Sequence, residues 1–356
     1  MALQTFTLTP QRVGVRLGRI LKHAMPKIVL GTVGVNDDFQ KNKGDTVKYR
    51  RFLQKGSTAA QPNRFFQDGA GDRASQYALD HLTSDGVTSN AETILVQDIT
   101  AQLNQYNVLY GYTDRTFDLY EDDIPKQMTE LVGERSGLIC EMALFATLKA
   151  STNKIFAGGT SRGTVSATLS LNILRRAARD LHANHAETVS NMTRKLPAGN
   201  YGTAPVGVCY PVFCSTDLIP DLRELPGFVP VEEYGNPAGA VENEVGKCES
   251  FRFICSPELV EIQDAGAAVA GSVPPLKSTT GTSADVYQVI IGSKDAWGHI
   301  GLNMDRKSVT AITPGQIDKA DPQGQRGYVG TKFYYNAVIL NNLQMKVIEV
   351  ATRSLA

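Results

Sequence analysis

The chain has 356 residues, enough to bury a sizeable core and to form roughly two domains. Its 36 Lys and Arg residues balance its 36 Asp and Glu residues, so the overall charge does not favour a free-standing nucleic-acid binder or a membrane-surface protein. Five cysteines and an opening that lacks a secretory-signal pattern indicate reduced thiols in a cytosol-like compartment. No apolar run approaches the roughly 20 residues of a membrane helix, so we expect a soluble protein.

The first 55 residues are strongly basic, with eleven Lys and Arg against three acids. Arg12, Arg16, Arg19 and Lys22 recur at helical spacing, which predicts a short helix with a basic side that ends before Pro26. Such a face is either simply solvated or turned toward an anionic partner. Residues 56–105 reverse the balance, with two Arg and six acids.

A projecting loop is predicted next. Thr46 to Leu53, which begins within "KNKGDTVKYRRF" (41–52), reads as a strand, and strand-like character resumes only in "AETILVQDITAQLNQYNVLYGYTD" (91–114). An irregular excursion of this length is unusual inside a compact domain. It favours a long protruding hairpin that contacts another surface.

A long helix over about 125–150 is the strongest helical prediction. Asp122 or Asp123 caps it, Pro125 suits its first turn, and acidic residues crowd its positive end. Leu131, Leu138 and Phe145 fall on one stripe, which predicts a helix lying on a sheet.

A second helix is predicted over 166–184, with Leu174, Ala177, Ala178 and Leu181 inward and Arg175, Arg176 and Arg179 outward. Short strands and turns follow, which indicates a separate α+β lobe. The tail from about 326 reads as two strands joined in a hairpin at Asn341-Asn342, with the last strand under the long helix.

No motif makes a positive case for catalysis, a cofactor or a metal. "AGGTSRG" (157–163) lacks the lysine of a P-loop and reads as a flexible turn. His182 and His185 with Cys209 and Cys214, or with Cys248 and Cys255, supply enough zinc ligands in number, but at spacings outside those of zinc knuckles. A cytosolic metal-dependent or Cys/His-dependent hydrolase is therefore the alternative from another class.

Several segments carry a family resemblance through their order along the chain. They are "KNKGDTVKYRRF" (41–52), "LTSDGVTSN", "VQDITAQLNQY" and "YTD" (within 82–114), "ELVGERSGL" (130–138), "DLRELPGFVPVEEY" (221–234), "VIIGSKDAWGHIGL" (289–302) and "DPQGQRGYVGTKFYYNAVILNN" (321–342). With them the chain resembles the N4 gp56-like family of tailed-bacteriophage major capsid proteins, which have the HK97-type fold. The stretch 58–82 looks longer than this family's usual loop.

The resemblance implies an α+β fold with an N-terminal arm (1–44), an E-loop (45–114), a P-domain (115–190) with its spine helix on an antiparallel sheet, an A-domain (191–304) and P-domain C-terminal strands (305–356). It implies self-assembly into hexamers and pentamers of an icosahedral virion shell, built in the host bacterial cytoplasm around packaged double-stranded DNA. Portal, scaffolding and decoration proteins are further implied partners, without a membrane. An encapsulin-like compartment shell is the alternative within the same fold.

On this interpretation two groups of charged residues are candidate contacts. Lys48, Arg50 and Arg51 are expected to meet acidic surface of a neighbouring subunit, for which the acids of the E-loop and Glu121, Asp122 and Asp123 are candidates. Arg12, Arg16, Arg19 and Lys22 are expected to face the DNA.

Overall fold

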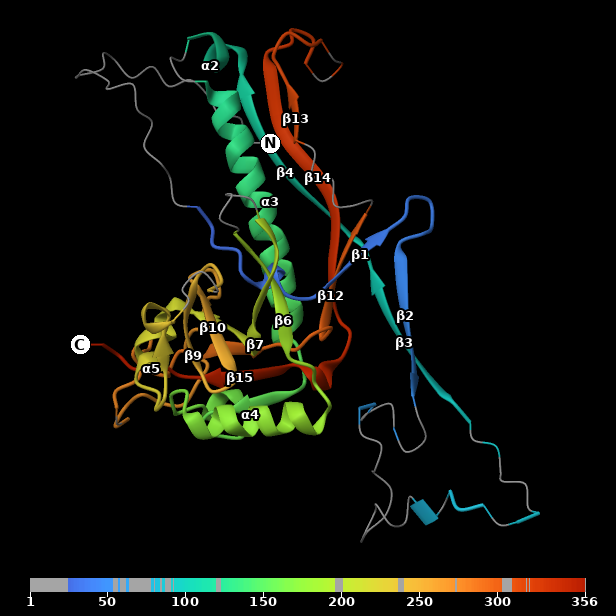
Figure 1. The fold of residues 1–356 in the computed structure, drawn as a ribbon. Coiled ribbons are helices and arrows are strands. Elements are labelled where there is room, and N and C mark those ends of the chain that lie inside the picture. Colours follow the sequence, from blue (N-terminus) through green and yellow to red (C-terminus); the bar gives the residue numbers. More distant parts are fainter. Residues whose placement is uncertain are drawn as a thin grey trace.

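The computed structural model describes residues 25–53, 93–119, 123–195, 201–235, 240–272, 274–302, 309–317 and 321–355, with residue 319 and short pieces between 57 and 91. Within these residues two sheets form the body, a long helix runs between them, and a two-stranded ladder projects to one side (Figure 1). The predicted basic helix with Arg12, Arg16, Arg19 and Lys22 lies outside the described residues, as does most of the stretch 58–82.

The predicted long helix is confirmed as α3 (Ile124–Lys149). Asp123 is its N-cap, and the Asp123 carboxylate accepts a hydrogen bond of 3.2 Å from the backbone N–H of Lys126. Phe145 is buried as expected, but Leu131 is exposed. The buried positions are Met128, Val132, Ser136, Glu141, Leu144, Phe145 and Leu148.

This stripe differs from the predicted one because α3 packs on different neighbours along its length. Met128 and Val132 contact the first sheet, whereas Leu144 and Leu148 reach the core beside the second sheet. Along α3, the buried polar residues Ser136 and Glu141 lie between these two groups of apolar residues.

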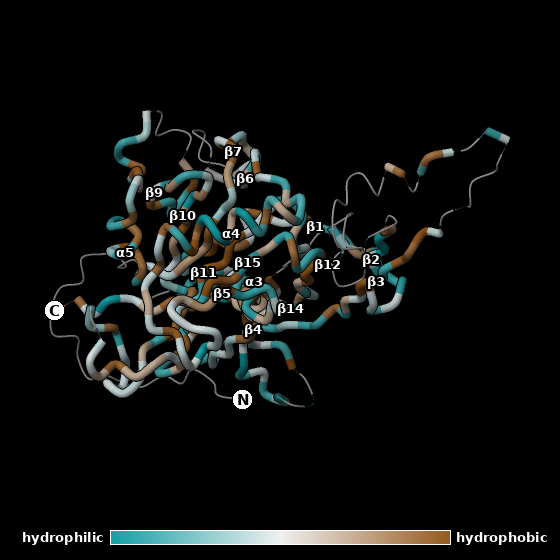
Figure 2. Tube along the Cα trace, turned by 90° about the horizontal axis from the view of Figure 1, so that it is seen from below, coloured by the Kyte–Doolittle hydropathy of each residue, from teal (hydrophilic) through white to brown (hydrophobic). Residues whose placement is uncertain are grey.

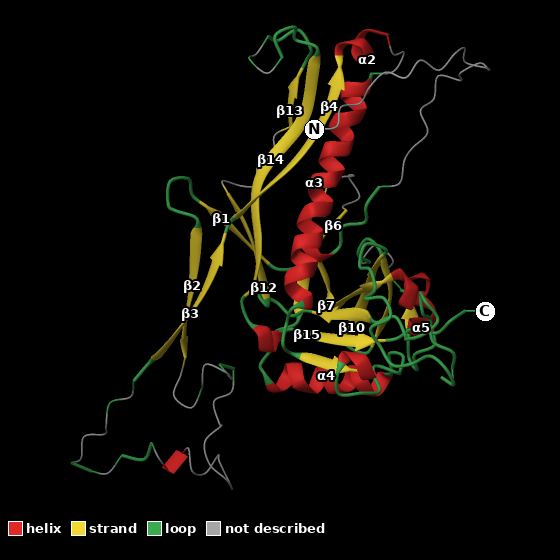
Figure 3. Cartoon of the chain, turned by 180° about the vertical axis from the view of Figure 1, so that it is seen from behind, coloured by secondary structure: helices red, strands yellow, loops and turns green. Residues whose placement is uncertain are grey.

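The first sheet has five strands and is centred on the long strand β14. Its members are β1 (Val35–Phe39), β4 (Asn104–Thr113), β12 (Trp297–Leu302), β13 (Val309–Ile312) and β14 (Arg326–Ile339). β14 pairs antiparallel with β4, β12 and β13, and β1 joins β12 in parallel. α3 lies along this sheet, as Figure 3 shows from behind.

The second sheet has eight strands and a mixed topology. Its members are β5 (Lys154–Phe156), β6 (Val189–Lys195), β7 (Tyr201–Ser215), β8 (Val229–Pro230), β9 (Glu244–Cys248), β10 (Phe251–Ser256), β11 (Tyr287–Ile291) and β15 (Lys346–Val350). Every residue of β11 and β15 is buried, which is typical of strands covered on both faces. In Figure 2 the apolar segments gather inside this lobe.

Short helices complete the body. They are α2 (Asp114–Leu119), α5 (Ile219–Arg223), and the 3₁₀ turns η1 (Leu30–Thr32), η2 (Arg162–Thr164), η3 (Thr216–Leu218), η4 (Val231–Glu233) and η6 (Asn342–Gln344). No helix of the described residues is long and apolar enough to span a membrane.

The second predicted helix is α4 (Leu171–Ala183). It begins five residues later than expected, and residues 166–170 are not helical. Leu174, Ala177 and Leu181 are buried against the eight-stranded sheet. Arg175, Arg176 and Arg179 are exposed, as predicted. α4 therefore covers the face of this sheet opposite the end of α3 (Figure 3).

The predicted C-terminal hairpin is wrong. β14 belongs to the five-stranded sheet, whereas β15 pairs with β11 and β5 in the eight-stranded sheet. Asn341 caps η6 instead of forming a tight turn, since its side chain accepts from the N–H of Leu343. This segment carries the chain from one sheet to the other, so that β14 packs along α3 while Val347 of β15 shares a core with the end of α3.

Sheet membership also differs from the predicted division of the chain. β1 and β4, expected in the arm and the loop, pair with β12 and β14, and β5, expected in 115–190, pairs with β15. α4, expected with the spine helix in 115–190, packs on the eight-stranded sheet. β12, expected in 191–304, pairs with β14 of the five-stranded sheet. β15, expected with the C-terminal strands of 305–356, is a central strand of the eight-stranded sheet.

Candidate assembly surfaces

The predicted contact residues lie on the projecting ladder, formed by β2 (Thr46–Leu53) and β3 (Leu95–Gln102). Side chains alternate between its two faces. Val47, Tyr49 and Ile99 lie on the inner face and pack against buried residues of β12 and β14. Lys48 and Arg50 lie on the outer, exposed face.

Asp98 neutralises part of the charge on the outer face. The Asp98 carboxylate lies 2.7 Å from Lys48 Nζ and 2.9 Å from Arg50 Nε, and Arg50 is directly opposite Asp98 in the ladder. Hydrogen bonds from Arg50 and Lys48 hold the pKa of Asp98 at about 2. Lys48 and Arg50 thus remain surface residues, but each already has a partner within its own chain.

Arg51 has a different environment from Lys48 and Arg50. It points to the inner face and donates a hydrogen bond of 2.5 Å to the backbone carbonyl of Leu340. Burial lowers its pKa. Since this guanidinium braces the ladder against its own body, the expectation that Arg51 meets a neighbouring subunit is not supported by its placement.

The outer end of the ladder carries an apolar patch that sequence reasoning missed. Phe52 is 67% exposed, and Val96 opposite it is 48% exposed. Ile94, just before β3, is 72% exposed, whereas Leu95 pairs with Leu53 on the other face of the ladder and is 57% exposed. Exposed large apolar side chains gathered at one end of the ladder favour a contact with another protein surface.

The acidic candidates at the start of the long helix have only partly been placed. The carboxylate of Asp123 is engaged in capping α3. Glu121 and Asp122 lie outside the described residues.

The segment before the ladder is held against α3 and β12 by backbone contacts of Val29, Leu30 and Val33, which we call the clamp. Glu141 of α3 is buried, and its carboxylate accepts hydrogen bonds of 2.9 and 2.8 Å from the backbone N–H groups of Val29 and Leu30. Burial raises the pKa of Glu141, although these N–H groups act in the opposite direction. The contact fixes residues 29–30 over a sequence separation of more than a hundred residues.

Trp297 and His299 of β12 hold the same segment a few residues later. The indole N–H of Trp297 and Nε2 of His299 both lie 3.1 Å from the carbonyl oxygen of Val33. Because that oxygen only accepts, Nε2 carries the proton, and burial lowers the pKa of His299 so that the ring stays neutral. Nδ1 then accepts from the hydroxyl of Tyr335, at 3.0 Å.

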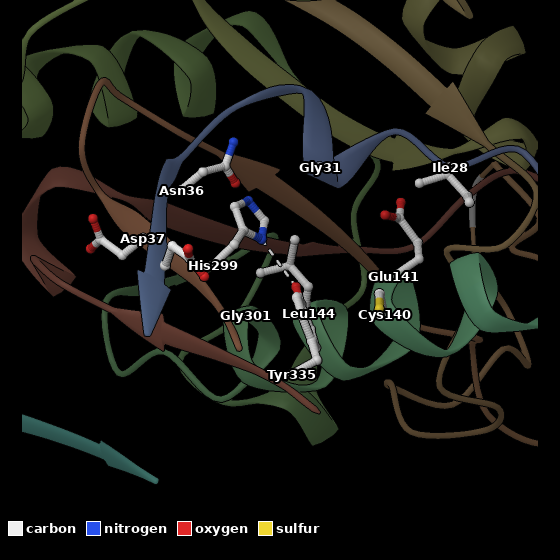
Figure 4. Close-up of a pocket in the computed structure, with 11 residues that line it drawn as sticks. Ile28, Gly31, Asn36, Asp37, Cys140, Glu141, Leu144, His299, Gly301 and Tyr335 are labelled. Carbon is white, nitrogen blue, oxygen red and sulfur yellow. Dashed lines mark hydrogen bonds between the residues drawn. The ribbon is translucent and has the colours of Figure 1, made fainter. Parts of the chain in front are cut away.

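Gly34 follows Val33 with a φ of +118°, and a Cβ there would lie 2.8 Å from Trp297 and 2.9 Å from His299. A side chain is therefore excluded at this position by both conformation and space. A cavity of about 420 Å³ lies beside the clamp. Figure 4 shows Glu141 and Ile28 on one side of it and His299 and Tyr335 on the other.

"AGGTSRG" forms a turn after β5, as predicted, and a side chain of this turn is anchored to the eight-stranded sheet. Arg162 donates two hydrogen bonds, of 2.8 and 2.7 Å, to the buried carboxylate of Glu349 in β15. Lys154 of β5 lies 3.0 Å from the same group. Burial pushes the pKa of Glu349 up, but the two cations outweigh it and hold the pKa below its ordinary value.

The structure places several of the residues weighed for zinc or nucleophilic chemistry. Cys214, Cys248 and Cys255 lie in the core of the eight-stranded lobe, and the ring of His182 packs edge-on against Tyr210. Among the described residues, no group of three or more His, Cys, Asp or Glu side chains is arranged to hold a metal ion.

Comparisons with known proteins place this architecture. No family model matches the chain. The major capsid protein of Pseudomonas phage KPP21 is 23% identical to it over 277 residues, which are 72% of this chain and 68% of that protein.

Solved phage capsid structures match nearly the whole chain. The capsid of cyanophage Pam1 matches with a TM-score of 0.60, 12% identity, and coverage of 97% of this chain and 98% of its own. The capsid of Ralstonia phage GP4 matches with a TM-score of 0.58 and 12% identity, covering 98% of this chain and 100% of its own. The capsid of cyanophage P-SCSP1u matches with a TM-score of 0.58 and 12% identity, covering 96% of this chain and 93% of its own. At this identity the likeness shows the fold, and the predicted α+β class with an HK97-type capsid fold is confirmed.

Proposed function

We propose that the chain is the major capsid protein of a tailed phage and belongs to the N4 gp56-like family. The observation that carries the proposal is the match over nearly the whole chain to solved phage capsid subunits, together with the 23% identical major capsid protein. In this role the chain assembles with copies of itself into hexamers and pentamers of an icosahedral shell around double-stranded DNA.

The shape of the subunit supports a mechanical role. A closed shell needs several different contact surfaces on each copy, and a body with a projecting arm offers them. The β2–β3 ladder buries only Leu53 and Ala101 of its own residues. We infer that its outer face, with the exposed apolar residues Phe52 and Val96 and with Ile94 beside them, completes its burial against a neighbouring copy.

Charge assists this contact in the proposal. Lys48 and Arg50 around Asp98 leave one net positive charge on the outer face. The acids Glu121, Asp122 and Asp123 of a neighbouring copy would complement it. Each such contact is modest, but linked contacts around a closed shell sum through effective concentration.

The remaining assignments start from the family resemblance, and the two domains follow the two sheets where the expected bounds differ from them. The five-stranded sheet with α3 corresponds to a P-domain, and the eight-stranded sheet with α4 to an A-domain. Residues 1–44 form the N-terminal arm, and Arg12, Arg16, Arg19 and Lys22 would contact packaged DNA through its phosphates without reading its sequence. Portal, scaffolding and decoration proteins would be partners, and assembly would occur in the host bacterial cytoplasm.

Two other functions are distinguishable from this one. An encapsulin-like compartment would share the fold and enclose an enzyme in place of a genome. The hydrolase has less support, since the relatives described above are named as capsid proteins and no described cluster binds a metal.

Sedimentation velocity with electron microscopy on the chain expressed alone tests the proposal. Closed shells or capsomer rings are the expected result. An enzyme found inside the shells would favour the compartment. A monodisperse small species with stoichiometric zinc would instead support the hydrolase.

A further inference from the structure

Two buried thiols face each other in the core of the eight-stranded lobe. Cys214 of β7 and Cys255 of β10 are direct partners in the parallel pairing of these strands. Their Sγ atoms are 3.2 Å apart, and both residues are buried.

The backbone geometry is compatible with a covalent bond between these residues. Paired strands lie about 4.8 Å apart, which is inside the Cα–Cα range of about 4.4–6.8 Å that disulfides span. The sulfur atoms have to approach to about 2.05 Å, a movement that small side-chain rotations supply. We propose that Cys214 and Cys255 are an oxidative modification site at which a reversible disulfide joins β7 to β10.

The reaction is a two-electron oxidation that needs an external oxidant of the disulfide or peroxide class. With glutathione disulfide, one thiolate attacks a glutathione sulfur and releases one glutathione as thiolate. The second protein thiolate then attacks the mixed disulfide, the Cys214–Cys255 bond forms, and the second glutathione leaves. Each protein thiol gives up one proton, and each glutathione released takes one up.

The environment makes this reaction slow and selective. The hydrogen bond with Cys255 and burial both raise the pKa of Cys214, so little thiolate is present at neutral pH. Attack therefore requires a local opening of the lobe. Two other buried thiols contact backbone carbonyls, Cys209 that of Val189 and Cys248 that of Pro226.

The site lies where the lobe meets the N-terminal segment. Ser256, the residue after Cys255, donates a hydrogen bond of 2.7 Å to the carbonyl of Lys27. A covalent bond at Cys255 would therefore fix the strand end that holds Lys27. The chemistry is independent of the proposed shell function, and only its timing rests on it: reduced during assembly in a reducing cytoplasm, oxidised after release.

The test uses the folded full-length chain in glutathione buffers of increasing oxidised-to-reduced ratio, incubated until the products stop changing. Free thiols are alkylated in denaturant, and peptides from a non-reducing digest are identified by mass spectrometry. The expected product is a Cys214–Cys255 peptide pair that is lighter by two hydrogen atoms than the two thiol peptides. Its yield should rise with the ratio and vanish after reduction.

Matched variants make the result specific. Cys255→Ala should lose the linked peptide, and Cys248→Ala, which removes another buried thiol of the same lobe, should keep it. The proposal is overturned if no linked pair forms at the most oxidising ratio, or if Cys209 or Cys248 joins Cys214 as readily as Cys255 does.

Discussion

The eight-stranded lobe and the β2–β3 ladder are both built of strands, yet they meet water very differently. All five residues of β11 and all five of β15 are buried. β2 and β3 bury one residue each, and their outer face carries exposed apolar groups. The lobe is stable through its own core, whereas the ladder leaves apolar surface for another molecule to cover.

The charges of the two regions differ in the same way. In the lobe, Glu349 has no exposed side-chain surface and is neutralised by Lys154 and Arg162. In the ladder, Asp98 binds Lys48 and Arg50 while all three stay in contact with water. The buried Glu349 cluster is therefore expected to affect the stability of the fold, and the exposed Asp98 cluster to affect mainly the association of copies.

Removing the buried carboxylate should have the largest effect on the lobe. Glu349→Ala leaves Lys154 and Arg162 without their shared partner, and we expect a loss of roughly 3–5 kcal/mol in the free energy of unfolding. Urea unfolding of the purified chain measures it. The matched control is Glu187→Ala, at an exposed ion pair with Lys294, with an expected loss of about 1 kcal/mol or less. Equal losses of unfolding free energy in the two variants would contradict the distinction between the buried and the exposed ion pairs.

Glu141→Leu should lower the free energy of unfolding somewhat less than Glu349→Ala does. It removes the acceptor of two buried N–H groups at Val29 and Leu30, which costs roughly 2–4 kcal/mol. Glu141→Gln keeps an acceptor oxygen and should cost less. Urea unfolding measures both, and limited proteolysis after Lys27 should accelerate in Glu141→Leu. Unchanged cleavage there would show that Glu141 does not hold the segment.

The two buried glutamates should respond to pH in opposite directions. The pKa of Glu349 is lowered on folding, so its stabilising contribution is complete above the unfolded value of about 4.3 and is lost as the pH falls through the folded pKa. The pKa of Glu141 is raised, so stability falls as the pH rises from the unfolded value through the folded pKa.

Unfolding free energies of wild type, Glu349→Gln and Glu141→Gln between acidic and neutral pH separate these effects. The advantage of wild type over Glu349→Gln should shrink at acidic pH. The balance between wild type and Glu141→Gln should shift toward the variant as the pH rises. Parallel curves for all three proteins would contradict both assignments.

Changes on the outer face of the ladder should have the smallest effect on the isolated chain. Phe52→Ser removes an exposed side chain, and we expect a change in unfolding free energy within about 0.5 kcal/mol. The concentration needed for assembly should nevertheless increase, because the patch loses its largest member. Light scattering against concentration measures the second quantity. An unchanged assembly threshold would exclude Phe52 from the contact.

Much of the fold could be predicted because it is encoded locally. Asp123, Pro125 and the apolar spacing defined α3, and the apolar stripe of α4 was equally clear. The sheet to which β15 belongs could not be predicted, because a fully buried strand fits either sheet and only its pairing with β11 distinguishes the two. The family resemblance supplied the architecture that local patterns could not.

The candidate site was less predictable. Lys48, Arg50 and Arg51 were recognisable as a basic strand, but strand alternation turns Arg51 inward, and the partner Asp98 is 48 residues from Arg50. Only the register of β2 against β3 brings them together. The link from Glu141 to residues 29–30 joins a helix to a distant turn and has no sequence signal.

Hydrogen exchange on the chain before and after assembly tests the central claim most directly, that the ladder completes its burial against another copy. The backbone N–H groups of β2 and β3 should exchange quickly in the unassembled chain and slowly in shells. Those of β11 and β15 should be protected in both states. Equal exchange of the ladder in the free chain and in shells would contradict the account.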